Sequence, residues 1–139
     1  MDIRPLDETL SISPQLSPAD LPSLAARGYR SVICNRPDGE APRQPAAAEI
    51  AAAAEAAGLE FRYIPVVGAP IGAADVAAFK AALENLPGPI LGFCRSGART
   101  TILWALARGG ERPADELIAA ARSAGLDLDG LRPRLEGRG

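Results

Sequence analysis

The sequence predicts one α/β domain over residues 1–139, in which helices cover both faces of a mostly parallel β-sheet. A length of 139 residues fits one core of ordinary size. Short apolar runs, typical of buried strands, alternate four times with longer segments typical of helices. The composition, 47% hydrophobic and 23% charged, is that of a globular protein. We therefore expect a packed three-layer sandwich.

Two short strands open the predicted domain. Alternating apolar and polar residues place them at Ile3–Pro5 and Thr9–Ser13, with a turn near Asp7 between them. A helix follows, because Ser17 offers an N-cap oxygen directly before a proline, which suits the first helical position. Gly28 provides the residue at which this helix ends.

The remaining elements alternate along the chain. Apolar runs predict the strands, and Ala-rich or amphipathic segments that end at glycine or proline predict the helices. We expect strands at Ser31–Cys34, Glu60–Pro65 and Ile90–Phe93, helices at Pro45–Ala57, Ala73–Leu86, Thr100–Arg108 and Pro113–Ala124, and a last turn at Leu131–Glu136.

The absence of histidine excludes several classes of enzyme. Without imidazole the chain cannot use a Ser-His-Asp triad, a Cys-His pair or a HExxH zinc site, and we expect no metal and no cofactor. A net charge of −2, with arginines dispersed among acids, argues against nucleic-acid binding. No basic leader and no long apolar stretch is present, so we expect a soluble, cytoplasmic protein with no membrane contact. The oligomeric state stays open.

Cys94 is the candidate nucleophile. It follows the predicted strand Ile90–Phe93 and precedes a helix, and ligands in such folds bind beyond the carboxyl ends of strands. Backbone N–H groups at a helix N-terminus lack intrahelical partners and attract anions. Together with Arg95 and Arg99, they should favour a thiolate at Cys94. This interpretation requires that solvent and substrate can reach the sulfur.

The residues around Cys94 fit an anion-binding loop. Gly97 can adopt the positive φ that curls the loop, and a hydroxyl of Ser96 or Thr100 can donate to the anion or to sulfur. Arg99 supplies a planar fork for two oxygens. We expect Cys94 and Arg99 to be catalytic, and the anion to be bound by Arg95, Ser96, Gly97, Ala98 and Thr100.

A structural role has to be weighed for each cysteine, because a lone cysteine at a strand end is often only a small buried hydrophobe. The density of arginine, glycine and hydroxyl residues favours a site at Cys94. Cys34 has no such neighbours, and we expect a structural role there. A regulatory Cys34–Cys94 disulfide stays open, since both lie at predicted strand ends. Trp104 is expected to pack in the core.

Four segments within residues 1 to 110 match a known family. They are Ile12–Pro18, Asn35–Glu40, Ile64–Val66 and Phe93–Thr100, the last running into Leu103–Leu106. On these segments the chain resembles the bacterial DUF442 family, the phosphatase-like domain that is also found fused to beta-lactamase-like hydrolases. The active loop is also similar to those of rhodaneses.

The resemblance implies a fold similar to that of dual-specificity phosphatases, a three-layer sandwich with Cys94 as nucleophile and the loop backbone as anion cradle. It also implies that the loop with Arg36 and Asp38 lies near the site, although from the residues alone a solvated turn is an equally good interpretation. Asp38 could reach the site only if its loop folds over it.

Two departures from the phosphatase pattern bear on the chemistry. The dual-specificity signature resembles His-Cys-x5-Arg, whereas four residues separate Cys94 from Arg99 here and Phe93 replaces the histidine. A phosphatase also needs an acid after the Ile-Pro-Val strand, and Val67–Pro70 holds no carboxylate. Asp75 lies further on and is expected to belong to the next helix.

These departures favour a sulfurtransferase, in which Cys94 takes a sulfane sulfur from a small anion such as thiosulfate or glutathione persulfide and becomes a persulfide. Such a reaction expels a stable anion and needs little acid catalysis. Two alternatives stay open. One is a cysteine phosphatase that acts on a phosphoester through a phosphocysteine, and the other is a non-catalytic module that senses anions or redox state.

Overall fold

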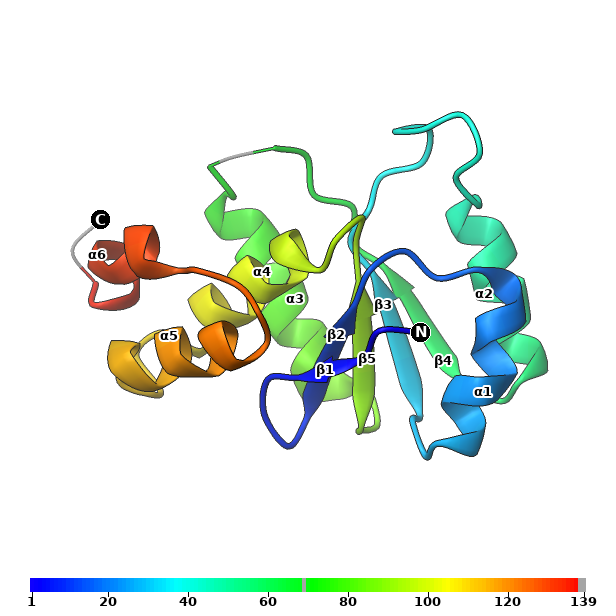
Figure 1. The fold of residues 1–139 in the computed structure, drawn as a ribbon, viewed down its shortest axis with the longest axis horizontal. Coiled ribbons are helices and arrows are strands. Elements are labelled where there is room, and N and C mark those ends of the chain that lie inside the picture. Colours follow the sequence, from blue (N-terminus) through cyan, green and yellow to red (C-terminus); the bar gives the residue numbers. More distant parts are fainter. Residues whose placement is uncertain (69, 138–139) are drawn as a thin grey trace.

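The protein is described by a computed structural model that covers residues 1–68 and 70–137. Within these residues, a five-stranded sheet lies between two groups of helices (Figure 1). Strand β1 pairs antiparallel with β2, and all other pairs are parallel. The predicted α/β class and the mostly parallel sheet are therefore confirmed. In the spatial order β1-β2-β5-β3-β4, the strands are Arg4–Pro5, Leu10–Ser13, Ile90–Phe93, Ser31–Cys34 and Glu60–Tyr63.

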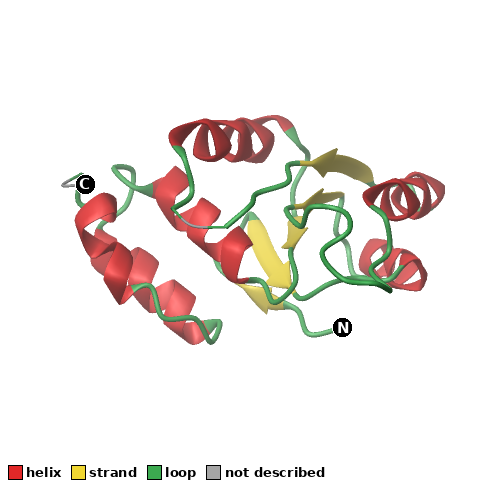
Figure 2. Cartoon of the chain, turned by 90° about the horizontal axis from the view of Figure 1, so that it is seen from above, coloured by secondary structure: helices red, strands yellow, loops and turns green. Residues whose placement is uncertain are grey.

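The helices form the two outer layers. Helices α1 and α2 cover one face, while α3 and α4 cover the other and carry α5 and α6 outside them (Figures 1 and 2). The α-helices are α1 (Leu21–Ala26), α2 (Ala47–Ala56), α3 (Ala73–Asn85), α4 (Ala98–Arg108), α5 (Ala114–Ser123) and α6 (Arg132–Leu135), with 3₁₀ turns η1 (Pro18–Asp20) and η2 (Asp129–Leu131) before α1 and α6.

The ends of the elements differ from prediction by a few residues. Helix α4 begins at Ala98, two residues before the predicted start, because Gly97 already provides its N-cap in a left-handed conformation. Strand β4 ends at Tyr63 and does not reach Pro65, which has no N–H for a ladder hydrogen bond.

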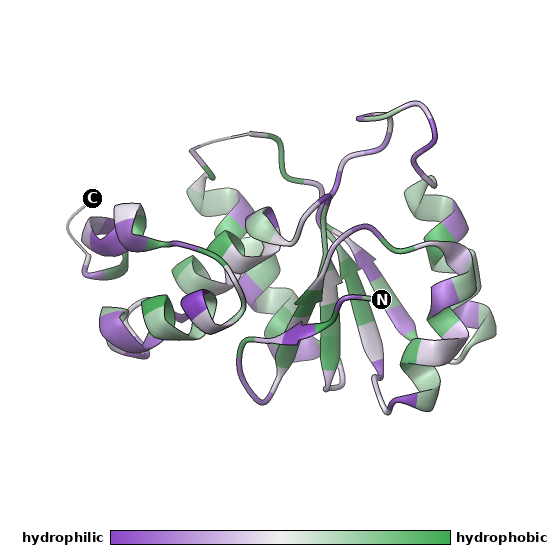
Figure 3. Ribbon diagram, in the orientation of Figure 1, coloured by the Kyte–Doolittle hydropathy of each residue, from purple (hydrophilic) through white to green (hydrophobic). Residues whose placement is uncertain are grey.

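The alternation of strand side chains divides the core into two clusters. Ile33 and Ile90 pack on the side of α3 to α5, whereas Val32 and Leu91 pack against α1 and α2. Figure 3 shows the resulting concentration of hydrophobic residues in the strands. Both faces of the central strands are buried, so their carboxyl ends are held at fixed positions beneath the loops.

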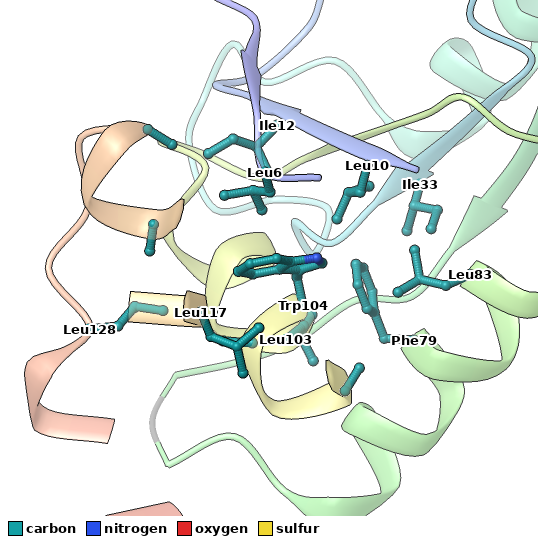
Figure 4. Close-up of a cluster of buried hydrophobic side chains, with 14 of the residues drawn as sticks. Leu6, Leu10, Ile12, Ile33, Phe79, Leu83, Leu103, Trp104, Leu117 and Leu128 are labelled. Atoms are coloured by element: carbon teal, nitrogen blue, oxygen red, sulfur yellow. The ribbon is translucent and has the colours of Figure 1, made fainter. Parts of the chain in front are cut away.

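Trp104 anchors α4 in the larger cluster. Its side chain is fully buried, as predicted, and lies beside Leu10, Phe79 and Leu103 (Figure 4). The indole Nε1 donates a hydrogen bond to Asp7 Oδ2 at 2.9 Å. The polar N–H group of this large side chain therefore has a hydrogen-bond partner inside the protein.

Asp7 is the acceptor around which the β1–β2 turn is built. Its Oδ1 accepts from the backbone N–H groups of Thr9 and Leu10, both at 2.8 Å, and its side chain is only 2% exposed. Arg108 lies 3.5 Å from Oδ2. Burial alone would raise the pKa of Asp7, but the hydrogen bond from Trp104, the backbone donors and the charge of Arg108 hold it below its ordinary value.

We predict that Asp7→Asn lowers the free energy of unfolding by about 2–4 kcal/mol at about pH 7. The new amide would turn its NH₂ either toward the Trp104 N–H or toward the two backbone N–H groups of the turn, so that one of these sets of donors loses its acceptor. It also removes a negative charge beside Arg108, which keeps Glu111 as a partner. Urea unfolding followed by the fluorescence of Trp104, the one tryptophan in the chain, measures the change.

The same experiment has a pH arm and a control. Because the folded-state pKa of Asp7 is depressed, its contribution is complete above the unfolded value near 3.8 and is lost as the pH falls through the folded value. The difference between wild type and variant should therefore shrink in acid, and a pH-independent difference would contradict the assignment. Glu8→Gln, at a side chain that is 91% exposed, should change stability by less than about 0.5 kcal/mol.

Candidate functional site

Cys94 lies at the carboxyl end of β5, in the turn that leads into α4 at the top of the sheet (Figure 1). The backbone N–H of Gly97 donates to Cys94 Sγ at 3.1 Å. Gly97 has a φ of +96°, a left-handed conformation that glycine adopts at no steric cost. The loop therefore curls around its own sulfur and turns a backbone donor toward it, as an anion-stabilising loop must.

Asn35 fixes the loop by joining the ends of three strands. Its N–H donates to Phe93 O at 2.8 Å, and its side-chain Nδ2 donates to Ile64 O at 2.9 Å. Its Oδ1 accepts from Thr100 Oγ1 at 2.9 Å, which ties α4 to the same point. Asn35 is fully buried, so each of these hydrogen bonds is shielded from water.

Thr100 lies behind the loop. It is fully buried, and its hydroxyl donates to Asn35, so the structure does not place it where the sequence analysis expected an anion donor. The close approach depends on Gly92, since a Cβ there would lie 2.7 Å from Thr100 Cγ2. Thr100 therefore holds the first turn of α4 against β5.

A cavity of about 720 Å³ opens beside the Cys94 loop, at the end of the sheet that Figure 2 shows from above. Three arginines and one glutamate supply its charged groups, and apolar side chains supply much of the remainder. The lining residues are Arg36, Glu40, Ala41, Pro42, Gly68, Ile71, Arg95, Arg99 and Ile102.

An ion pair between Arg99 and Glu40 spans this cavity. Arg99 Nη1 and Nη2 donate to Glu40 Oε2 and Oε1, both at 2.8 Å, and Nη1 also donates to Val66 O at 3.0 Å. Arg36 Nε donates to Glu40 Oε1 at 3.0 Å. The hydrogen bonds from Arg99 lower the pKa of Glu40 most. Burial raises it, but the hydrogen bond from Arg36 and the charges of both arginines lower it further, to about 2. Glu40 is therefore ionised at neutral pH.

Arg99 lies next to Cys94 as well as to the glutamate. Its pKa is raised chiefly by the hydrogen bonds to Glu40, and the neighbouring Cys94 sulfur contributes further. Cys94 is only 1% exposed, which differs from the accessible sulfur that the sequence analysis required. The sulfur is enclosed by its own loop and lies next to a guanidinium that Glu40 already holds.

The loop after β3 carries Arg36 and Asp38, which the resemblance placed together near the site. In the structure only Arg36 lies at the cavity. Arg36 is buried at the cavity, where Nη1 donates to Gln15 Oε1 at 3.1 Å in addition to its bond to Glu40. Asp38 is exposed and points elsewhere, since its Oδ1 accepts from the N–H of Ala47 at 2.8 Å. Asp38 thus caps the start of α2 and does not line the cavity.

Of the other residues that the sequence analysis considered for the site, some line the cavity and others do not. Arg95 is exposed and lines the cavity, while Ser96 is exposed and its Oγ accepts from the N–H of Ala98 at 3.4 Å. Asp75 lies in the first turn of α3, as expected, and not at the cavity. Of Val67–Pro70, Ala69 lies outside the described residues.

Glu40 is the functional candidate that the sequence analysis missed. Its partner Arg99 is 59 positions away, so no local spacing connects them. The available signal was an acid directly after the Arg36–Gly39 turn, in a segment that also matches the family. A left-handed Gly39, with φ +79°, turns the chain immediately before Glu40.

Cys34 is buried and shows no sign of catalysis. Burial raises the pKa of its thiol to about 11, and its Sγ contacts Arg36 O at 3.5 Å. Both cysteines are free thiols. Within residues 1–68 and 70–137, no group of three or more Cys, Asp or Glu side chains could hold a metal ion. None of the helices described is both long and apolar enough to cross a membrane.

Known proteins with similar structures share this arrangement of layers. A candidate phosphatase from Neisseria meningitidis superposes with a TM-score of 0.88 at 40% identity, covering 100% of this chain and 99% of that one. TpbA from Pseudomonas aeruginosa, solved in complex with phosphotyrosine, gives a TM-score of 0.63 at 19% identity and covers 99% and 91%. These likenesses confirm the phosphatase-like sandwich that the resemblance implied.

Sequence comparison identifies the family. A beta-lactamase hydrolase-like protein of Xylella fastidiosa is 41% identical over 130 residues, which are 92% of this chain and 30% of that protein. The chain thus spans about a third of the length of its curated relatives. Residues 2–111 match the family model described as the phosphatase-like domain of beta-lactamase hydrolase-like protein. The chain belongs to this family of phosphatase-like domains.

Proposed function

We propose that this domain is a cysteine-dependent phosphatase that acts on phosphomonoesters with a good leaving group. The observation that carries the proposal is the Gly97 N–H on Cys94 Sγ at 3.1 Å, in a loop whose Arg95 and Arg99 line the adjoining cavity. A backbone donor and one guanidinium group beside a sulfur, with a second guanidinium group in the lining of the adjoining cavity, suit the binding of a tetrahedral anion. Membership of a phosphatase-like family supports the same chemistry.

The reaction would proceed in two steps at one sulfur. The Cys94 thiolate attacks phosphorus, an S–P bond forms, and the P–O bond to the leaving group breaks, so that the leaving oxygen takes the electron pair. Water then attacks the phosphocysteine, the S–P bond breaks, and inorganic phosphate leaves with Cys94 again a thiolate. Arg99 and the loop N–H groups would stabilise the charge on the equatorial oxygens in both steps.

The charged groups of the cavity restrict the leaving group. Glu40 is the one carboxylate among the described lining residues, and with a pKa of about 2 it has no proton to donate at neutral pH. A leaving group must then depart as an anion, which favours a phenolate over an alkoxide. The apolar side chains of Pro42, Ile71 and Ile102 would accommodate an aromatic ring. TpbA, which has a similar fold, was solved with phosphotyrosine.

A sulfurtransferase is the second candidate, and a separate observation favours it. Only four residues separate Cys94 from Arg99, and the described cavity lining offers no protonated acid to the leaving group. With thiosulfate, the Cys94 thiolate would attack the outer sulfur, the S–S bond of thiosulfate would break, and sulfite would leave. The persulfide on Cys94 would then give its outer sulfur to cyanide, forming thiocyanate and restoring the thiolate.

We predict hydrolysis of p-nitrophenyl phosphate with a burst of p-nitrophenol, and loss of both in Cys94→Ser. An alkyl phosphate should react about 10²–10⁴-fold more slowly, because no acid protonates its leaving oxygen. Stopped-flow absorbance measures the burst, and phosphate release measures turnover on both esters. Comparable rates on the two esters would contradict the absence of an acid.

The same preparation separates the candidate functions. Intact-mass measurement after thiosulfate or glutathione persulfide should show no gain of a sulfur atom on Cys94, and cyanide should yield no thiocyanate. A sulfur adduct with thiocyanate formation, without phosphate release, would replace the phosphatase by the sulfurtransferase. No reaction with either substrate class would leave the non-catalytic anion or redox sensor.

We predict that Cys34 takes no part in either reaction. Cys34→Ala should retain turnover within about threefold, because its side chain packs with the α1–α2 side of the core. In Cys94→Ser, iodoacetamide at about pH 8 should leave native Cys34 unlabelled, since burial and a pKa of about 11 keep it a neutral thiol. Mass spectrometry detects the label, urea-unfolded protein is the positive control, and rapid native labelling would contradict the assignment.

A further inference from the structure

Glu40 occupies the groups that an anionic substrate would need. Both terminal nitrogens of Arg99 donate to its two oxygens at 2.8 Å, which is the two-point contact that a guanidinium makes with phosphate oxygens. Arg36 Nε adds a third hydrogen bond to the same carboxylate. The two terminal N–H groups with which Arg99 could make a bidentate contact to an anion are therefore already bonded to Glu40.

The position of Glu40 is set by its loop and not by the Cys94 loop. Its backbone N–H donates to Gln44 Oε1 at 3.1 Å, and Gln44 Nε2 donates to Pro37 O at 2.8 Å. The Gln44 side chain thus ties the backbone at Glu40 to Pro37. The Glu40 side chain is 30% exposed, and its carboxylate makes the contacts with Arg99. Rotation of this one side chain would free the guanidinium without movement of the backbone.

We propose that Glu40 is an internal competitor for the anion site, so that a ligand binds only by displacing its carboxylate from Arg99. This inference rests on the proposed function in that it assumes an anion site at Cys94 and Arg99. It adds to that function the identity of the group that competes with the substrate, the Glu40 carboxylate. The ligands that succeed are those whose oxygens match the fork of Arg99 better than a carboxylate does.

Charge explains which ligands can overcome such a competitor. Arg36, Arg95 and Arg99 bring three positive charges to the cavity, and Glu40 removes one of them. Exchange of one carboxylate for another monoanion gains little, whereas a dianion such as a phosphate monoester gains attraction from all three arginines. The competitor weakens every anion by the same factor, so that monoanions, which the arginines attract less, fall below useful affinity while dianions stay above it.

The experiment compares two nonreactive ligands of the same shape, phenylphosphonate and benzenesulfonate. At about pH 8 the first carries two negative charges and the second one. Their dissociation constants are measured by calorimetry on Cys94→Ser alone and combined with Glu40→Gln. We expect Glu40→Gln to tighten both ligands by the same factor, roughly three- to tenfold, because the same ion pair no longer has to be broken.

A matched variant controls for the general change in charge. Glu111→Gln removes a carboxylate that pairs with Lys80 and Arg108 and lies outside the cavity, and it should leave both dissociation constants within about twofold. Melting curves verify that each variant is folded.

Three results would overturn the proposal. Weaker binding in Glu40→Gln would mean that Glu40 orients Arg99 for the ligand. A gain that is clearly larger for phenylphosphonate than for benzenesulfonate would mean simple repulsion between charges, and an unchanged affinity would mean that the carboxylate is never displaced. The binding measurement does not depend on turnover. Equal gains in binding together with an inactive wild type would remove the phosphatase and keep the competitor, whereas wild-type turnover without any gain in binding would do the reverse.

Discussion

The geometry of the candidate site depends on the contact between Gly92 and Thr100. A side chain at position 92 would overlap the Thr100 methyl group, so the first turn of α4 can lie against β5 only because glycine stands there. That approach brings the Thr100 hydroxyl to Asn35, which also binds Phe93 and Ile64. The ends of β3, β4, β5 and α4 are therefore joined at one buried amide, and the Cys94 loop is hydrogen-bonded to Asn35 at both of its ends.

The order of the elements could be predicted from the sequence because its signals are local. Apolar runs such as Ile90–Phe93 and helix ends such as Gly28 carry their information within a few residues. The start of α4 was less predictable: the sequence analysis placed it at Thr100, whereas Gly97 provides the N-cap and the helix begins at Ala98. The two faces of the sheet follow from the alternation of side chains, which is also local.

The site was only partly predictable, because its parts meet through contacts between distant segments. The Cys94 loop is contiguous and its curvature follows from Gly97, whereas Glu40 and Arg99 meet only after β3 and β5 have paired. The hydroxyl of Thr100 had two partners within reach in principle, an anion in front and Asn35 behind. Only the packing against Gly92 decides between them.

The ionisation state of Glu40 also limits the reactions that this site can catalyse. A carboxylate with a pKa of about 2 cannot supply a proton, and the described part of the cavity lining holds no other acid. Phosphoryl and sulfane-sulfur transfer would therefore use the same thiolate and the same arginines, and would differ only in the electrophile. In both, the leaving group must be stable as an anion, because the protein offers it charge stabilisation and no proton.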